Sequence, residues 1–251
     1  MKQFVFVLSF LILAGSVKAQ MPGKDQIGTE LWKWEIYGGR TVASNGWGAN
    51  IQYGKVKSLK YRQIFGLTYN NIKHYKEYKS FNYFLNDASG FYYGKVNSVL
   101  AFRPYYGGKR TIFKKSRDKG VEISWIWGVG INLSMIKPTY LKIRKFNSGG
   151  SVTTEEIYNP EEHPIESIVG RASFFKGFGD LKFAPGIYAK TGAFFDITAK
   201  KERIFGLEVG FQLDTYFQRV PIMNIEKNEF MYPAVYLNIL FGKKHEKYGG
   251  E

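Results

Sequence analysis

The sequence has 251 residues, a formal net charge of +15 and no cysteine. Without cysteine the chain has neither a disulfide framework nor a cysteine for lipid attachment. Aromatic residues make up 18% of the chain, with 21 Phe and 18 Tyr, and aromatic girdles at membrane interfaces are typical of outer-membrane barrels.

The first residues have the pattern of a secretory signal peptide. Lys2 is followed by an apolar run from Phe4 to Ala14 and by the small-residue site Val17-Lys18-Ala19. An uncleaved anchor is the alternative, but the run is shorter than the roughly 20 residues that span a bilayer. We therefore predict a cleaved signal peptide over residues 1–19, an N-terminal lead over 20–28, a barrel over 29–242 and a periplasmic tail over 243–251.

The charge of an exported chain limits its partners. Loss of Lys2 and Lys18 leaves a net charge of about +13 (15 − 2). Such a balance in an exported protein predicts contact with outer-membrane lipids, an acidic periplasmic protein or a cell-wall polymer, and no contact with nucleic acid.

Strands with alternating apolar and polar residues begin at Leu31 and recur along the first half of the chain. In a strand, successive side chains point to opposite faces. The first predicted strand places Trp32, Trp34 and Ile36 on one face, and Ser44-Asn45-Gly46 follows as a tight turn. The apolar faces of the next three predicted strands are Trp47, Ala49, Ile51 and Tyr53; Leu59, Tyr61, Phe65, Leu67 and Tyr69; and Tyr92, Val96, Leu100, Phe102 and Tyr106.

The fifth and seventh predicted strands have the clearest alternation and are expected to face lipid on one side. Their lipid-facing residues are Val121, Ile123, Trp125, Trp127, Val129, Ile131 and Leu133 in the fifth, and Phe205, Leu207, Val209, Phe211 and Leu213 in the seventh. A sixth strand lies around Phe183–Ile197 and an eighth around Met231–Phe241. Eight strands predict an all-β fold, an eight-stranded antiparallel up-and-down transmembrane β-barrel.

A soluble barrel with the apolar face turned inward is the rival fold. Glycines such as Gly128, Gly130, Gly206 and Gly210 occupy the polar face, where a narrow lumen needs small side chains. We therefore predict a polar interior whose charges are Lys33, Glu35, Lys95, Arg103, Glu122, Lys190, Asp196, Glu208 and Asp214. A network of paired charges is the expected state, and a narrow ion or small-solute conduit is the alternative.

The connections predict which end faces outward. Long connections at about 72–89, 137–180 and 218–229 are expected outside the cell, and short turns inside. The connection from Gly107 to Gly120 breaks this rule and is strongly basic. It predicts a basic periplasmic hairpin made by Lys109, Arg110, Lys114, Lys115, Arg117 and Lys119.

The sequence contains no recognisable catalytic, cofactor or metal motif. His74, His163 and His245 fall in predicted loops or the tail, where a solvated role is the usual one. We predict a structural or interaction protein without an open pore. A lipid A-modifying enzyme that uses His74 with Ser80 or Ser89 is the enzymatic alternative.

Three segments resemble a known group of proteins. Phe91–Lys95, Arg103–Gly107 and Gly120–Pro138 are similar to segments of small outer-membrane β-barrel proteins of Bacteroidota, and the layout loosely resembles OmpA- and OmpX-type barrels. The resemblance covers mainly residues 91–143, and it implies fold and location but no activity. Such barrels often end at a terminal aromatic residue, whereas Phe241 is followed by residues 242–251.

Overall fold

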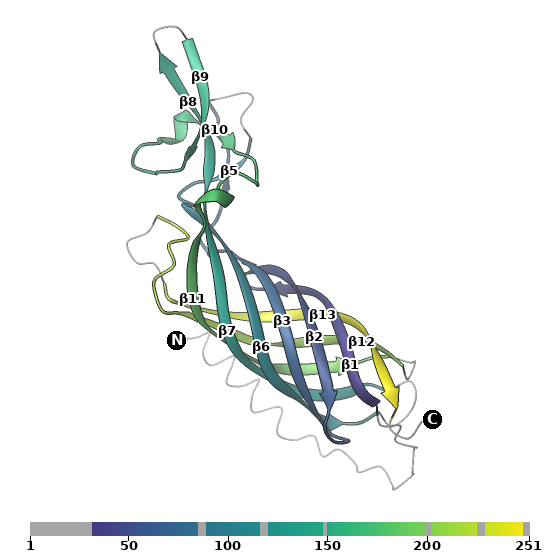
Figure 1. Ribbon diagram of the computed structural model, residues 1–251. Helices are drawn as coiled ribbons and strands as arrows, with labels where there is room; N and C mark the ends of the chain where they lie inside the picture. The colour runs from purple at the N-terminus through teal and green to yellow at the C-terminus, as the bar shows by residue number, and fades with distance from the viewer. Residues whose placement is uncertain are drawn as a thin grey trace, which may run out of the picture.

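The computed structural model describes residues 32–84, 89–115, 120–147, 150–198, 202–224 and 229–247. Eight strands close into an antiparallel barrel in which each strand pairs with the next along the chain and the last pairs with the first (Figure 1). They are β1 (Trp32–Ala43), β2 (Gly46–Val56), β3 (Tyr61–Ile72), β6 (Asn97–Phe113), β7 (Glu122–Pro138), β11 (Lys182–Asp196), β12 (Arg203–Tyr216) and β13 (Met231–Lys247). This confirms the predicted all-β, eight-stranded antiparallel up-and-down barrel.

The two ends of the barrel differ in their connections. One end carries residues 57–60, 114–121 and 197–202, and we call it the turn end. The other carries residues 44–45, 73–96, 139–181 and 217–230, and we call it the loop end. The predicted signal peptide and N-terminal lead lie outside the described residues, and the described part of the chain holds no helix long and apolar enough to span a membrane.

Apolar and polar side chains alternate along each strand, which gives the barrel wall an apolar outer face and a mostly polar inner face. In β7, Val129 and Ile131 are 51% and 54% exposed, whereas Asn132 and Ser134 are completely buried. The same pattern runs through β12, where Phe205, Val209 and Phe211 are exposed. Because a slip of one residue would exchange the two faces, this pattern fixes the register between strands.

Two predicted boundaries are wrong. The barrel part of the fourth strand is β6, which begins at Asn97 and continues to Phe113, so Tyr92 lies outside the wall and Lys109 inside it. Gly107 does not make a turn; it faces Gly128, and a Cβ there would come within 2.0 Å of Trp127 O. β13 likewise continues to Lys247, which places most of the predicted tail in the barrel wall.

Beyond the loop end, the two longest connections form a small second unit, which we call the platform. The strands of the platform are β4 (Lys79–Ser80) paired with β5 (Phe91–Tyr92), and a three-stranded sheet of β8 (Tyr140–Asn147), β9 (Gly150–Ile157) and β10 (Ile168–Arg171). Single 3₁₀ turns, η1 (Ile165–Ser167) and η2 (Phe178–Asp180), complete it. Its core consists of Phe91, Leu141, Ile143, Tyr158 and Ile168. Figure 1 shows the β8–β9 hairpin projecting away from the barrel.

Candidate functional site

An ion pair without solvent access occupies the lumen near the loop end. Arg103 Nη2 of β6 donates to Asp214 Oδ2 of β12 at 2.7 Å, and neither side chain is exposed. Asn132 Nδ2 donates to the second oxygen of the same carboxylate at 2.7 Å. Ser134 Oγ donates in turn to Asn132 Oδ1 at 2.7 Å. The cross-barrel contact therefore joins β6, β7 and β12 through one carboxylate.

A second ion pair lies in the middle of the lumen. Lys190 Nζ of β11 donates to Glu208 Oε1 at 2.9 Å, and Gln52 Nε2 of β2 donates to Glu208 Oε2 at 3.0 Å. The ammonium also lies 4.4 Å from the ring centroid of Tyr105. Amide, ring and carboxylate thus replace the water that this cation would need.

A third cluster fills the turn end of the lumen. Glu35 of β1 forms ion pairs with Lys109 and, at 3.4 Å, with Arg62. Arg62 also lies 3.4 Å from Glu122, and Thr111 Oγ1 donates to Glu122 at 3.2 Å. The assignment of Lys109 to a periplasmic hairpin is therefore wrong, because Lys109 is 3% exposed and neutralises a buried carboxylate.

The rest of the predicted basic hairpin divides between the lumen edge and the surface. Lys115 Nζ lies 3.2 Å from Asp196 Oδ1 and donates to Thr198 O at 2.6 Å. Arg110 and Lys114 are exposed. Arg117 and Lys119 lie outside the described residues. Asp196 is also 3.6 Å from Lys244, so it connects the β6–β7 connection to the last strand.

Two predicted lumen charges lie elsewhere or at the edge. Lys33 is half-buried at the turn end of β1. Lys95 is outside the barrel wall, where its Nζ lies 2.6 Å from Glu77 Oε2. Burial lowers the pKa of Lys95, and the Glu77 carboxylate opposes that shift. Placing Lys95 in the lumen was wrong because the β6 ladder starts two residues later.

The connection between β12 and β13 closes the loop end of the lumen. Val220 and Ile222 are 0% and 1% exposed, and both pack with Tyr216 and Tyr232 in one apolar cluster. The backbone of this segment is fixed to β6, because the N–H groups of Val96 and Asn97 both donate to Ile222 O. We call residues 220–223 the plug. The sequence predicts a connection at about 218–229, and the apolar run Val-Pro-Ile-Met within it is a usable signal for a buried segment.

An open pocket of about 720 Å³ lies at the loop end, beside the β1–β2 turn; we call it the rim pocket. It is lined by Val42, Ala43, Ser44, Asn45, Gly46, Trp47, Lys73, His74, Tyr75, Glu77, Glu229, Tyr232 and Pro233. His74 is 7% exposed, and burial lowers its pKa. Its Nδ1 accepts a hydrogen bond from the N–H of Lys76 at 3.2 Å, so the neutral ring carries its proton on Nε2.

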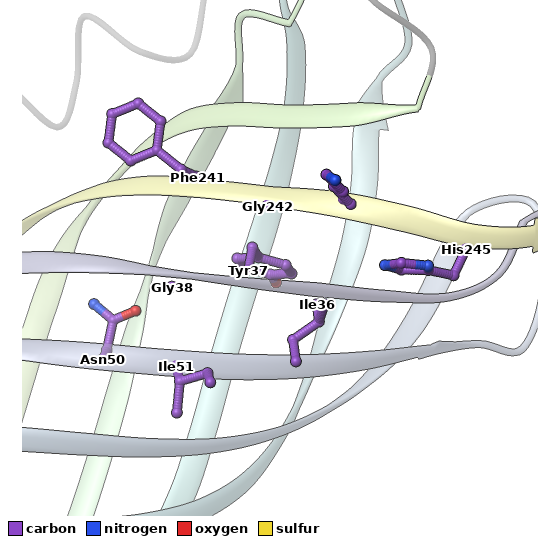
Figure 2. Close-up of a pocket in the computed structure, with 9 residues that line it drawn as sticks. Ile36, Tyr37, Gly38, Asn50, Ile51, Phe241, Gly242 and His245 are labelled. Atoms are coloured by element: carbon purple, nitrogen blue, oxygen red, sulfur yellow. The ribbon is translucent and has the colours of Figure 1, made fainter.

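A shallower hollow of about 310 Å³ lies on the outside of the wall where β1 meets β13 (Figure 2). It lies over Gly38, and its sides are formed by Ile36, Ile51 and Phe241, with His245 at one end. His245 stacks on Trp34, with the ring centroids 4.0 Å apart. The hollow exists because Gly38 leaves an outward position without a side chain.

Arg40 is the unexpected residue of the outer face. On β13, β1 and β2 the described outward positions run from Met231 to Phe241, from Ile36 to Val42 and from Trp47 to Tyr53, and only Arg40 among them is charged. It is exposed, and it pairs across the ladder with Ile239 and Ala49. It forms no ion pair or hydrogen bond in the described structure. The sequence analysis gives the apolar face of the first strand only as far as Ile36, and the same alternation continued by two outward positions reaches Arg40.

The geometry does not assemble a catalytic site in the described residues. His74 Nδ1 accepts from the N–H of Lys76, and the His74 backbone N–H donates to the Glu77 carboxylate at 3.0 Å. His163 Nδ1 accepts from Asn159 N–H at 3.1 Å. Neither has a serine hydroxyl as a hydrogen-bond partner. Within the described ranges no group of three or more His, Asp or Glu residues could hold a metal ion.

Comparisons with known proteins found similar solved structures and no matching family model. No protein-family model matches the sequence, and no curated protein matches it. Among solved structures, Neisserial surface protein A is 10% identical with a TM-score of 0.38, and the match covers 84% of this chain and 96% of that one. Ail, the attachment invasion locus protein of Yersinia pestis, is 8% identical with a TM-score of 0.42, covering 86% and 100%. Similarity this low does not bear on function, and the strand topology itself establishes the barrel.

Proposed function

We propose that the protein is an outer-membrane anchor that carries an interaction platform on the cell surface and has no open pore. One observation carries this proposal: the lumen is filled with ion pairs and capped by the plug, while the outer wall is apolar. A closed interior gives the barrel no transport path, which leaves the projecting platform as the part that can act on other molecules.

The length of the apolar belt supports the placement in a membrane. The outward residues of β13 remain uncharged from Met231 to Phe241, and Lys243 follows. Ten residue steps of about 3.4 Å on a strand tilted by about 40° give a height of roughly 26 Å. This height matches the roughly 25 Å apolar band of outer-membrane barrels.

The lengths of the connections support an orientation with the loop end outside. Outer-membrane barrels have short periplasmic turns and long external loops. The exposed basic residues Lys55, Arg110, Lys114, Arg203 and Lys243 then lie at the periplasmic rim, where we propose contact with anionic headgroups. An acidic periplasmic protein or a cell-wall polymer is the alternative partner of this rim.

Exposed aromatic rings on the platform support an interaction role. Tyr83 is 92% exposed, Phe84 75%, Tyr78 74% and Phe146 79%. Aromatic side chains are enriched at protein interfaces, and apolar groups gathered on a surface mark contact sites. None of these four residues belongs to the platform core, so their rings are available to a partner.

Cysteine labelling tests location and orientation, because the native chain has no cysteine. We expect Lys145→Cys, in the platform, to react with a membrane-impermeant maleimide on intact cells. The matched variant Lys243→Cys should react only after the outer membrane is permeabilised. Equal labelling of both variants in intact cells would contradict the proposed placement.

Planar bilayer recordings test the absence of a pore. We expect no conductance steps from the native protein, because ion-paired side chains occupy the lumen at three levels. A steady, ion-selective current that Glu208→Gln alters would contradict the closed lumen and favour a conduit.

Mass spectra of lipid A from cells with and without the protein test the enzymatic alternative, and a changed acyl pattern lost in His74→Ala would establish it.

A further inference from the structure

We propose that the rim pocket binds the phosphorylated sugar headgroup of a glycolipid in the outer leaflet, with Arg40 and Lys73 as its phosphate ligands. This inference rests on the proposed membrane placement and orientation. It adds to the closed barrel a defined lipid site at the β1–β2 hairpin.

The size and walls of the rim pocket suit a sugar. A volume of about 720 Å³ lies within the usual range for small-ligand sites, about 300–1,000 Å³. Trp47 and Tyr75, which are 47% and 71% exposed, offer apolar ring faces. The C–H face of a sugar ring packs on such rings while its hydroxyl groups form hydrogen bonds.

Unpartnered polar groups in the pocket lining provide those hydrogen bonds. Among the described residues the Nε2–H of His74 has no acceptor, although the ring is more than nine-tenths buried. Both side-chain amide atoms of Asn45 also have no hydrogen-bond partner in the part of the chain that the structure describes. Buried polar groups are nearly always hydrogen-bonded. A hydroxyl group both donates and accepts, so one sugar edge satisfies the imidazole donor together with the amide.

Two cations, Arg40 on the turn-end side of the pocket and Lys73 in its lining, point to a phosphate. Arg40 lies two residues before Val42, a pocket residue, which is about 7 Å along an extended strand. Its outward neighbours Gly38 and Ala49 are small and leave space around the guanidinium. Lys73 lines the pocket itself, together with the carboxylates of Glu77, which is paired with Lys95, and of Glu229. An unpaired arginine facing hydrocarbon is costly, and a phosphate held between Arg40 and Lys73 removes that cost through charge-assisted hydrogen bonds.

The position of Arg40 excludes the other occupants. A soluble sugar reaches the rim pocket but not a residue within the apolar belt. A second copy of this chain would bring two Arg40 side chains together, and the neighbouring described outward positions offer no carboxylate to separate them. A lipid with a phosphorylated sugar supplies the ring, the anion and the acyl chains at the required depths.

Native mass spectrometry of the detergent-solubilised full chain tests this site, with lipid A, dephosphorylated lipid A and phosphatidylglycerol as probes. We expect lipid A to be retained at least about tenfold better than phosphatidylglycerol. Arg40→Leu should reduce lipid A retention about tenfold and leave dephosphorylated lipid A unchanged. His74→Ala and Asn45→Ala should weaken both forms. The control Lys142→Leu removes an exposed cation of the platform, away from the rim pocket and from the periplasmic rim, and should change neither.

Several outcomes would overturn the proposal. Equal retention of lipid A and phosphatidylglycerol would exclude a headgroup site, as would retention that no rim variant changes. Full competition by soluble glucosamine 1-phosphate would show that a sugar phosphate without acyl chains suffices. Heat-modifiable migration on gels checks that each variant is folded. Because cysteine labelling reports the orientation separately, correct labelling without lipid A preference would overturn this site alone and leave the proposed function standing.

Discussion

The barrel and the platform separate polar from apolar side chains in opposite ways. In the barrel wall, the exposed residues are apolar and the buried ones include Arg103, Lys190 and Glu208. In the platform, the buried core is apolar, and β9 is exposed along most of its length. Apolar side chains therefore face outward in the barrel and inward in the platform, because the proposed surroundings are hydrocarbon around the wall and water around the platform.

The largest expected effect comes from breaking the buried pair that distinguishes the barrel. Asp214→Ala leaves the Arg103 guanidinium unpaired without solvent access, and we expect a loss of about 3–5 kcal/mol in the free energy of unfolding. Urea titration in lipid vesicles measures it. The combined change Arg103→Met with Asp214→Leu should recover most of that loss. In the platform, Lys145→Ala breaks the surface ion pair with Glu156, and we expect no measurable change.

A charge on the outer wall should also destabilise strongly. We expect Val129→Arg to cost about 2–4 kcal/mol, because its outward position lies in the apolar belt. Gly128→Arg should also be unfavourable, but through crowding, since a Cβ there already comes within 2.8 Å of Tyr105 Cδ2. Shortening the ring with Tyr105→Ala should rescue only the second variant. Rescue of both, or of neither, would contradict the assigned faces.

Removing the charge of Arg40 from the apolar outer wall should stabilise the barrel. In vesicles of phosphatidylcholine, which carry no sugar phosphate, we expect Arg40→Leu to raise the free energy of unfolding by about 1–2 kcal/mol. Added lipid A should stabilise the native protein and narrow or reverse that difference. A destabilised leucine variant in phosphatidylcholine would show that Arg40 has a structural role within the barrel.

The smallest expected effect is a pH dependence confined to the rim. The pKa of His74 is lowered in the folded state by burial, so the unfolded segment binds a proton more readily. The stability that neutral His74 contributes is present above its ordinary pKa of about 6.5 and declines as the pH falls below that value. Hydrogen exchange of residues 73–77, corrected for intrinsic rates, should therefore be faster at pH 5 than at pH 7. His74→Gln should remove the difference, and exchange in β7 should not change with it.

Alternation in the sequence was enough to predict most of the barrel. Residues such as Trp125 and Val129 on one face, with Ser124 and Asn132 on the other, identified strands, their number and their polar interior. The period of two is a local property of extended backbone, and a wall between two different solvents imposes it on every strand. Arg103, Lys190, Glu208 and Asp214 were named as lumen charges for the same reason, and the structure places all four in the interior.

Pairing partners and boundaries depended on the tertiary structure. Lys109 looked like part of a basic hairpin, and only the closure of the barrel brings it to Glu35 of the first strand. The apolar run of the plug is visible in the sequence, but its core is not, because these residues acquire a core only when inward residues of β3, β6, β7, β11, β12 and β13 close around them. Periodicity reports which face a residue occupies but carries no information about which distant residue shares that face. Barrel closure decides those contacts, and with them the closed lumen and the rim pocket.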